Sequence, residues 1–195
     1  MEFLRSMELY LPVTVLCAIG LFLTKEVVEY WKKRSEKKRK VAAYKMLIAE
    51  ECMKNSWAIK SLRSHIRSLE HPDLRSVRIE STSYGLILEC CFDGGSLGSS
   101  PIVNVYTAIF EKNVVDLAVI DGELFSHAKN AYESLAEVTS CLHQLREFAS
   151  KNDLLHLQGL ADYSSEIVDD AEVDLKSLFK YCTNEELSHK LRSFI

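Results

Sequence analysis

The sequence predicts an all-α protein with one N-terminal transmembrane helix followed by a cytoplasmic helical bundle, leaving room for a small β element near residues 74–92. Three observations support this fold class. Sixteen uncharged and mostly apolar residues run from Leu9 to Thr24. No Gly or Pro occurs between Leu21 and His71, which permits one long helix. The chain has only seven Gly and three Pro, and this argues against an all-β fold with many tight turns.

A transmembrane helix is predicted over Leu9–Thr24 because aromatic and basic residues flank the run. Tyr10 lies near one end, and Tyr30 and Trp31 lie near the other, as in the aromatic belts of membrane interfaces. Seven Lys/Arg follow within residues 32–40, whereas only one precedes the run. The positive-inside rule then puts the N-terminus outside the cell inner membrane and the C-terminus in the cytoplasm. A cleaved signal peptide and a buried core helix remain as alternatives.

Charge is distributed unevenly along the chain. Residues 1–45 hold ten Lys/Arg against five Asp/Glu, whereas residues 46–195 hold fourteen against twenty-three. We therefore expect three parts. These are an N-terminal transmembrane anchor (1–31), a polybasic exit that leads into a long, oligomerising helix (32–70), and a cytoplasmic helical domain (71–195).

The long helix carries an apolar stripe whose members are spaced alternately four and three residues apart, as in a coiled coil. We call this stripe the heptad seam. Its central members are Ile48, Cys52, Asn55, Ile59, Leu62 and Ile66. A polar residue such as Asn55 on a seam costs stability and helps to fix register and oligomeric state. One interpretation is self-association into a small homo-oligomer, and the other is packing of the helix against its own domain.

Basic residues are concentrated at the end of this helix and just after it. Lys60, Arg63 and Arg67 share one helical face, and Arg75 and Arg78 follow the break at His71-Pro72. One interpretation is a binding site for an anionic ligand, namely a nucleotide, an oligonucleotide or a phosphorylated partner. The other is a solvated face, or cations that pair with the acidic helices downstream.

The segment after the long helix is harder to assign. Leu74–Glu80 alternates weakly, which is typical of a short strand or an extended linker. Tyr84–Phe92 is either a buried strand or two turns of helix, since periodicity does not decide at that length. Asp93–Pro101 is rich in Gly and Ser and predicts a loop, without the pattern of a phosphate-binding P-loop. Ile102–Lys112 is apolar and predicts a helix.

Two further helices are predicted with clearer periodicity. Asp121 is expected to cap a helix that runs to about Lys151. Its apolar face follows a 3–4 spacing and comprises Leu124, Ala128, Ala131, Leu135, Val138, Leu142, Leu145 and Phe148. A second helix is expected over Leu154–Tyr181. Thr183, followed by two glutamates, is expected to cap a short final helix that reaches the C-terminus.

Catalytic and metal-binding motifs are absent from the sequence. The six cysteines include no C-x-x-C pair, and no HExxH, GxSxG or GxGxxG pattern occurs. Acidic pairs such as Asp169-Asp170 are adjacent and therefore diverge on a helix. We expect a protein that is not an enzyme and holds no cofactor or metal, with reduced cysteines that mostly lie in the core.

One face of the predicted span is mildly polar. Thr14, Cys17, Leu21 and Thr24 recur at 3-4-3 spacing and are expected to line a pore or a helix–helix contact. Together with the apolar run, the basic exit at Lys32–Lys40 and the acidic helical body, this plan resembles the small membrane-disrupting effectors of bacterial antiphage systems. It is similar in particular to the single-pass, nucleotide-regulated channels of Hailong-like operons.

The resemblance implies an oligomeric membrane channel in antiviral defence, gated by a nucleotide or oligonucleotide. Lys60, Arg63, Arg67, Arg75 and Arg78 would then contact this messenger. The second hypothesis is a non-enzymatic, membrane-anchored adaptor or scaffold that docks a cytoplasmic protein partner. The acidic surface between Asp116 and Asp174 would suit a basic partner of that kind.

Overall fold

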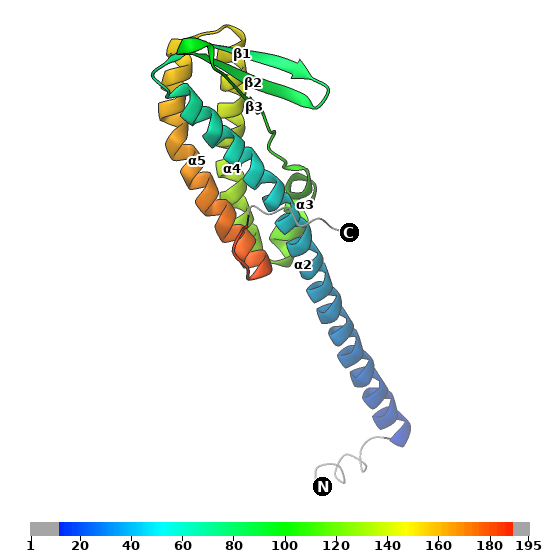
Figure 1. The fold of residues 1–195 in the computed structure, drawn as a ribbon. Helices are drawn as coiled ribbons and strands as arrows, with labels where there is room; N and C mark the ends of the chain where they lie inside the picture. Colours follow the sequence, from blue (N-terminus) through cyan, green and yellow to red (C-terminus); the bar gives the residue numbers. More distant parts are fainter. Residues whose placement is uncertain (1–11, 189–195) are drawn as a thin grey trace. The chain divides into compact units, whose positions relative to one another are not determined.

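A computed structural model describes residues 12–188 of the chain as helices and one small antiparallel sheet (Figure 1). It divides into two compact units, Met1–Ala43 (unit 1) and Tyr44–Ile195 (unit 2), so the division falls inside the predicted long-helix part. The elements in chain order are α2 (Val13–Leu69), β1 (Leu74–Thr82), β2 (Gly85–Phe92), the 3-10 turn η1 (Asp93–Gly95), β3 (Leu97–Pro101), α3 (Ala108–Ile120), α4 (Gly122–Ser150) and α5 (Leu154–Thr183).

The predicted transmembrane helix is wrong. Across residues 12–188, no helix contains a stretch that is both long and apolar enough to cross a bilayer. Residues 13–24 are apolar, but Lys25, Glu26 and Glu29 follow directly in the same helix. The first part of the predicted run, residues 9–11, lies outside the described residues. The single-pass topology and the inner-membrane localisation were predicted from this helix, so these two predictions are wrong as well.

The core of unit 2 lies between the C-terminal half of α2 and the long helices α4 and α5. Figure 1 shows α4 and α5 as neighbouring antiparallel helices. The 3–4 stripe predicted for α4 is confirmed, because its members from Leu124 to Leu145 are buried and Phe148 is half-buried. The predicted cap is confirmed as well, since the Asp121 carboxylate accepts a hydrogen bond from the Leu124 N–H at 3.1 Å.

Polar residues also define both ends of helix α5. The side chain of Asp153 accepts a hydrogen bond from the backbone N–H of His156 at 3.3 Å and so caps its first turn. At the other end Asn184 adopts a left-handed conformation with φ of 58°, which stops the helix after Thr183. The final helix predicted from Thr183 is therefore wrong for residues 184–188, while residues 189–195 lie outside the described part of the chain.

The sheet is a three-stranded antiparallel meander in the order β1-β2-β3. Its inner face is apolar and places Val77 opposite Cys90, beside the buried Leu88. Of the alternatives left open for residues 74–92, both segments are strands, whereas the prediction of a loop over Asp93–Pro101 is wrong for its second half. There β3 pairs with β2, with Ser100 opposite Leu88, so backbone hydrogen bonding outweighs the low strand propensity of Gly and Ser.

Candidate functional site

The heptad seam lies in the core of unit 2. All six side chains from Ile48 to Ile66 are at most 5% exposed within a single chain. The five apolar members pack into the same cluster as residues of α4 and α5. A second copy of the chain therefore has no access to them in this structure, and packing against its own domain is the interpretation that the burial supports.

Asn55, the polar member of the seam, binds the backbone of a distant segment. Its Nδ2 donates to the Tyr106 carbonyl at 2.8 Å, and its Oδ1 accepts from the Tyr106 N–H at 2.7 Å. Both backbone groups of one residue in the 102–107 connection are thus satisfied by one buried side chain. Residues 102–107 form no regular structure, and the helix predicted over Ile102–Lys112 begins only at Ala108.

Glu51, one turn earlier on α2, caps α3 from outside. Its carboxylate accepts hydrogen bonds from the N–H groups of Ile109 at 3.0 Å and Phe110 at 3.2 Å, and from the Tyr132 hydroxyl. The side chain is buried, with 2% of the residue exposed. Burial, with the hydrogen bond to Glu51, raises the pKa of Tyr132 far above its usual value, so the hydroxyl stays a donor. The role of Glu51 was not predicted from the sequence, because this residue belongs to no recognisable motif.

His65 is a further buried polar residue on α2. Ser61 Oγ donates to the Pro101 carbonyl at 2.6 Å, so its contact with His65 Nε2 at 3.1 Å makes the ring the donor. Ser100 Oγ then donates to Nδ1 at 2.9 Å. Neither ring nitrogen contacts a carboxylate, which distinguishes this group from a Ser-His-Asp arrangement. Its effect is to attach β3 to α2.

We expect the buried His65 to make folding sensitive to mild acid. Burial lowers its pKa to about 4, against the opposing effect of the Pro101 carbonyl. The unfolded chain binds a proton at this residue near the normal pKa of about 6.5, so stability is lost as the pH falls from about 6.5 toward 4. The expected loss is about 2 kcal/mol between pH 7 and pH 5.

Urea unfolding of the chain and of His65→Gln at pH 7, 6 and 5 measures this effect. The variant is expected to lose less stability than the wild type over this interval, because glutamine does not titrate. Equal pH dependence of the two proteins would contradict a depressed pKa at His65.

The five basic residues predicted to bind a ligand separate into two places. Arg75 and Arg78 lie on β1, where Arg75 pairs with Asp93 of η1 and Arg78 pairs with Glu89 of β2. Arg75 binds Asp93 with both Nε and Nη2, the latter at 2.6 Å, and Arg78 binds Glu89 at 2.6 Å. These two cations are paired, but their partners lie in η1 and β2 and not in the acidic helices downstream.

Lys60, Arg63 and Arg67 line a groove between α2 and α5, which we call the α2–α5 groove. Arg63 lies at its centre and binds Glu172 and Asp169 of α5, the latter at 2.6 Å. Burial by itself would lower the pKa of Arg63, but the hydrogen bonds that its guanidinium donates to the two carboxylates outweigh burial, so the pKa is raised. Lys60 and Arg67, in contrast, have no carboxylate within 4 Å among residues 12–188.

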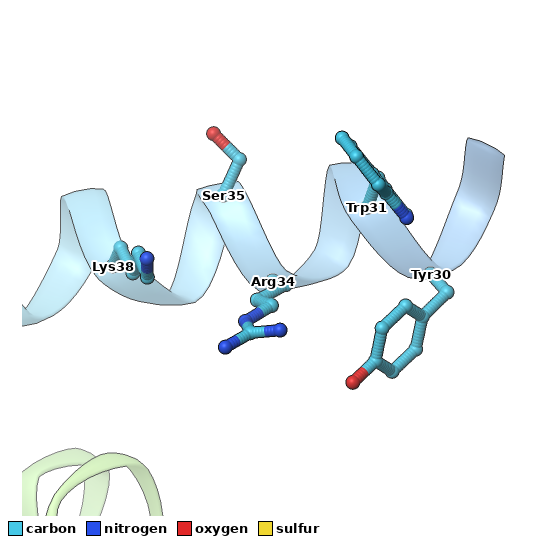
Figure 2. A pocket seen from close by; sticks show the side chains of 5 residues that line it. All are labelled: Tyr30, Trp31, Arg34, Ser35 and Lys38. Atoms are coloured by element: carbon cyan, nitrogen blue, oxygen red, sulfur yellow. The ribbon is translucent and has the colours of Figure 1, made fainter. Parts of the chain in front are cut away.

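A second candidate surface lies on α2 in unit 1, where aromatic and basic side chains share the helix surface. Figure 2 shows Tyr30 and Arg34 projecting to one side of the helix, Trp31 projecting to the other side, and Lys38 one turn beyond Arg34. The rings are open to solvent, with Tyr30 62% and Trp31 72% exposed. We call these four residues the basic–aromatic face.

Within the described residues, the cations around this face lack acidic partners. In the described part of unit 1, the only ion pair joins Lys25 to Glu29 at 3.7 Å. The seven Lys/Arg within residues 32–40 have no carboxylate within 4 Å among the described residues, although Glu36 lies in the same stretch. The segment therefore presents a dense positive charge next to exposed aromatic rings.

The residues predicted to line a pore also lie on α2 in unit 1. Thr14, Cys17, Leu21 and Thr24 are exposed. The Thr24 hydroxyl donates to backbone carbonyls of its own helix, those of Gly20 and, at 3.2 Å, Leu21. Its hydrogen bonding is thus satisfied without a partner helix.

No group of three or more His, Cys, Asp or Glu within residues 12–188 is arranged to hold a metal ion. Comparison with known proteins gave no match: no family model, no curated protein and no solved structure matches the chain. The function is therefore argued from the two surfaces described above.

Proposed function

We propose that the protein is a non-enzymatic adaptor that binds anionic lipid surfaces through the basic–aromatic face of unit 1. The observation that carries this proposal is the combination of exposed Tyr30 and Trp31 with seven cations, in residues 32–40, that have no acidic partner among residues 12–188. Tyr and Trp favour the boundary between headgroups and acyl chains. Each Lys or Arg near an anionic membrane surface adds about 1 kcal/mol of attraction.

A lipid surface suits this helix better than a nucleic acid does. Large apolar side chains are exposed along the same helix of unit 1, among them Phe22, Leu23, Val27 and Val28. A lipid interface offers an apolar phase that can cover such side chains while the headgroups meet the cations. A phosphate backbone would pair only with the cations and leave the apolar surface in water.

The adaptor part of the proposal rests on the contrast between the two units. Residues 46–195 hold twenty-three Asp/Glu against fourteen Lys/Arg. An acidic body is repelled by an anionic membrane and attracts a basic protein partner. Of the two functions expected from the sequence, the adaptor needs only attachment to a membrane, whereas the channel needs a helix that spans it.

We expect the full chain to bind vesicles of phosphatidylcholine mixed with phosphatidylserine, and to bind pure phosphatidylcholine at least tenfold more weakly. Arg34→Glu/Lys38→Glu should reduce the partition coefficient for the anionic vesicles at least tenfold, because two attractions become repulsions. Co-sedimentation with vesicles measures both effects. A Trp57→Phe background leaves Trp31 as the only tryptophan, and its emission should shift to the blue on binding.

The matched control is Lys129→Glu/Lys151→Glu, which makes the same change of charge at exposed positions of unit 2. It should retain most of the vesicle binding. Equal binding to neutral and anionic vesicles, or an equal loss in the control, would overturn the proposal. Tighter binding to duplex DNA than to anionic vesicles would overturn it too, in favour of a nucleic-acid-binding helix.

A further inference from the structure

The α2–α5 groove contains two hollows, one on each side of Arg63. The first has a volume of about 190 Å³, and its floor consists of the buried side chains of Ile59, Leu175 and Leu187. The second has about 230 Å³ and is lined mainly by polar groups, including the carboxylates of Glu70 and Asp169. The two hollows therefore offer different chemistry to a ligand.

Charge distinguishes the first hollow. Lys60, Arg63 and Arg67 line it together with a single carboxylate, that of Glu172. In the second hollow, two arginines meet two carboxylates, so the charges balance. The first hollow thus has an excess of positive charge, and its cations without an ionic partner among residues 12–188 are Lys60 and Arg67.

Arg63 is already fixed in position. Its guanidinium binds Asp169 at 2.6 Å and also Glu172, and Glu172 is held in turn by Lys176 at 2.5 Å. Lys60 has no ionic partner among the described residues and lies over the ring of Trp57, with Nζ 5.0 Å from the ring centroid. A ligand anion can therefore bind Lys60 and Arg67 without breaking an existing ion pair.

The floor of the first hollow requires an apolar ligand group. A cavity of about 150 Å³ is enough to hold one benzene ring, so about 190 Å³ accommodates an aromatic ring. We propose that the first hollow binds a small organic phosphate, with its ring on the apolar floor and its phosphate between Lys60 and Arg67. Nucleoside monophosphates and aryl phosphates share this chemistry.

The proposal is tested on the full chain carrying Trp31→Phe, which leaves Trp57 beside Lys60 as the only tryptophan. Phenyl phosphate, adenosine monophosphate and inorganic phosphate are titrated separately while Trp57 emission is recorded. At least one of the two organic phosphates is expected to bind at least tenfold more tightly than inorganic phosphate. The organic phosphate that binds more tightly shows whether the ligand is a nucleotide or a smaller phosphate ester.

Lys60→Ala/Arg67→Ala should raise the Kd of the tighter ligand at least tenfold. The matched control is Arg75→Ala/Arg78→Ala, which removes the same charge from two cations that already pair with Asp93 and Glu89. The Kd of this control should stay within twofold of the wild-type value. If neither organic phosphate binds more tightly than inorganic phosphate, or if both double variants weaken binding equally, the proposed site is wrong. Vesicle binding through unit 1 is measured in a separate experiment. A failure of the proposed lipid binding is therefore distinguishable from a failure of the proposed phosphate site.

Discussion

Replacing Glu51 by alanine is expected to lower the free energy of unfolding of unit 2 by about 4 kcal/mol. The substitution removes three hydrogen bonds and leaves the N–H groups of Ile109 and Phe110 and the Tyr132 hydroxyl without their acceptor. Each buried polar group left unsatisfied costs about 1–3 kcal/mol. The first turn of α3 also loses the negative charge near its N-terminus.

Urea denaturation followed by tryptophan fluorescence measures this loss. The neighbouring Glu50 is the matched control, since it is partly exposed and only pairs with Lys54 along the same helix. Glu50→Ala should cost less than about 0.5 kcal/mol. Glu51→Gln should fall between the two, because an amide supplies one acceptor oxygen where the carboxylate supplies two. Similar losses for Glu50→Ala and Glu51→Ala would show that the buried carboxylate has no special effect.

Replacing Asn55 by leucine is expected to destabilise unit 2 by about 3 kcal/mol, even though leucine suits an apolar helix stripe. The change leaves the N–H and the carbonyl of Tyr106 unpaired in a place where Asn55 is fully buried. Thermal and urea unfolding at several protein concentrations measure the effect, which should not depend on concentration.

The same variant separates the two interpretations of the heptad seam. If Asn55 set the register of an oligomer, leucine would strengthen the assembly at that position. Greater stability in Asn55→Leu, rising with protein concentration, would therefore favour self-association. Asn113→Ala is a suitable control, because this asparagine only donates to the Ile109 carbonyl within its own helix, at 2.6 Å. It should cost clearly less than Asn55→Leu.

Local signals were enough to predict α4 and most of α5. Asp121 satisfies N–H groups of its own first turn, and the 3–4 stripe that follows it faces one core. Such information lies within a few residues of the position that it determines. The same holds for β1 and β2, where the short connection between Thr82 and Gly85 forms a hairpin.

Partners distant in the sequence determined what could not be predicted. The strand β3 is poor in strand-forming residues and depends on pairing with β2 and on the contacts of Ser100 and Pro101 with α2. The start of α3 depends on Asn55 and Glu51, more than fifty residues earlier. The five basic residues predicted to form one site lie in two places, because Arg75 and Arg78 pair with Asp93 and Glu89 near the sheet. Spacing along a helix does not predict such pairs.

Two buried polar side chains of α2, those of Glu51 and Asn55, bind main-chain atoms, and this has a consequence for how the sequence can vary among relatives. Asn55 and Glu51 bind the backbone of residues 106, 109 and 110. Every amino acid except proline offers the same N–H and carbonyl there. The side chains along that connection are thus free to diverge at their exposed positions, provided that proline is avoided at the bonded N–H groups. Positions 51 and 55 themselves have few acceptable replacements.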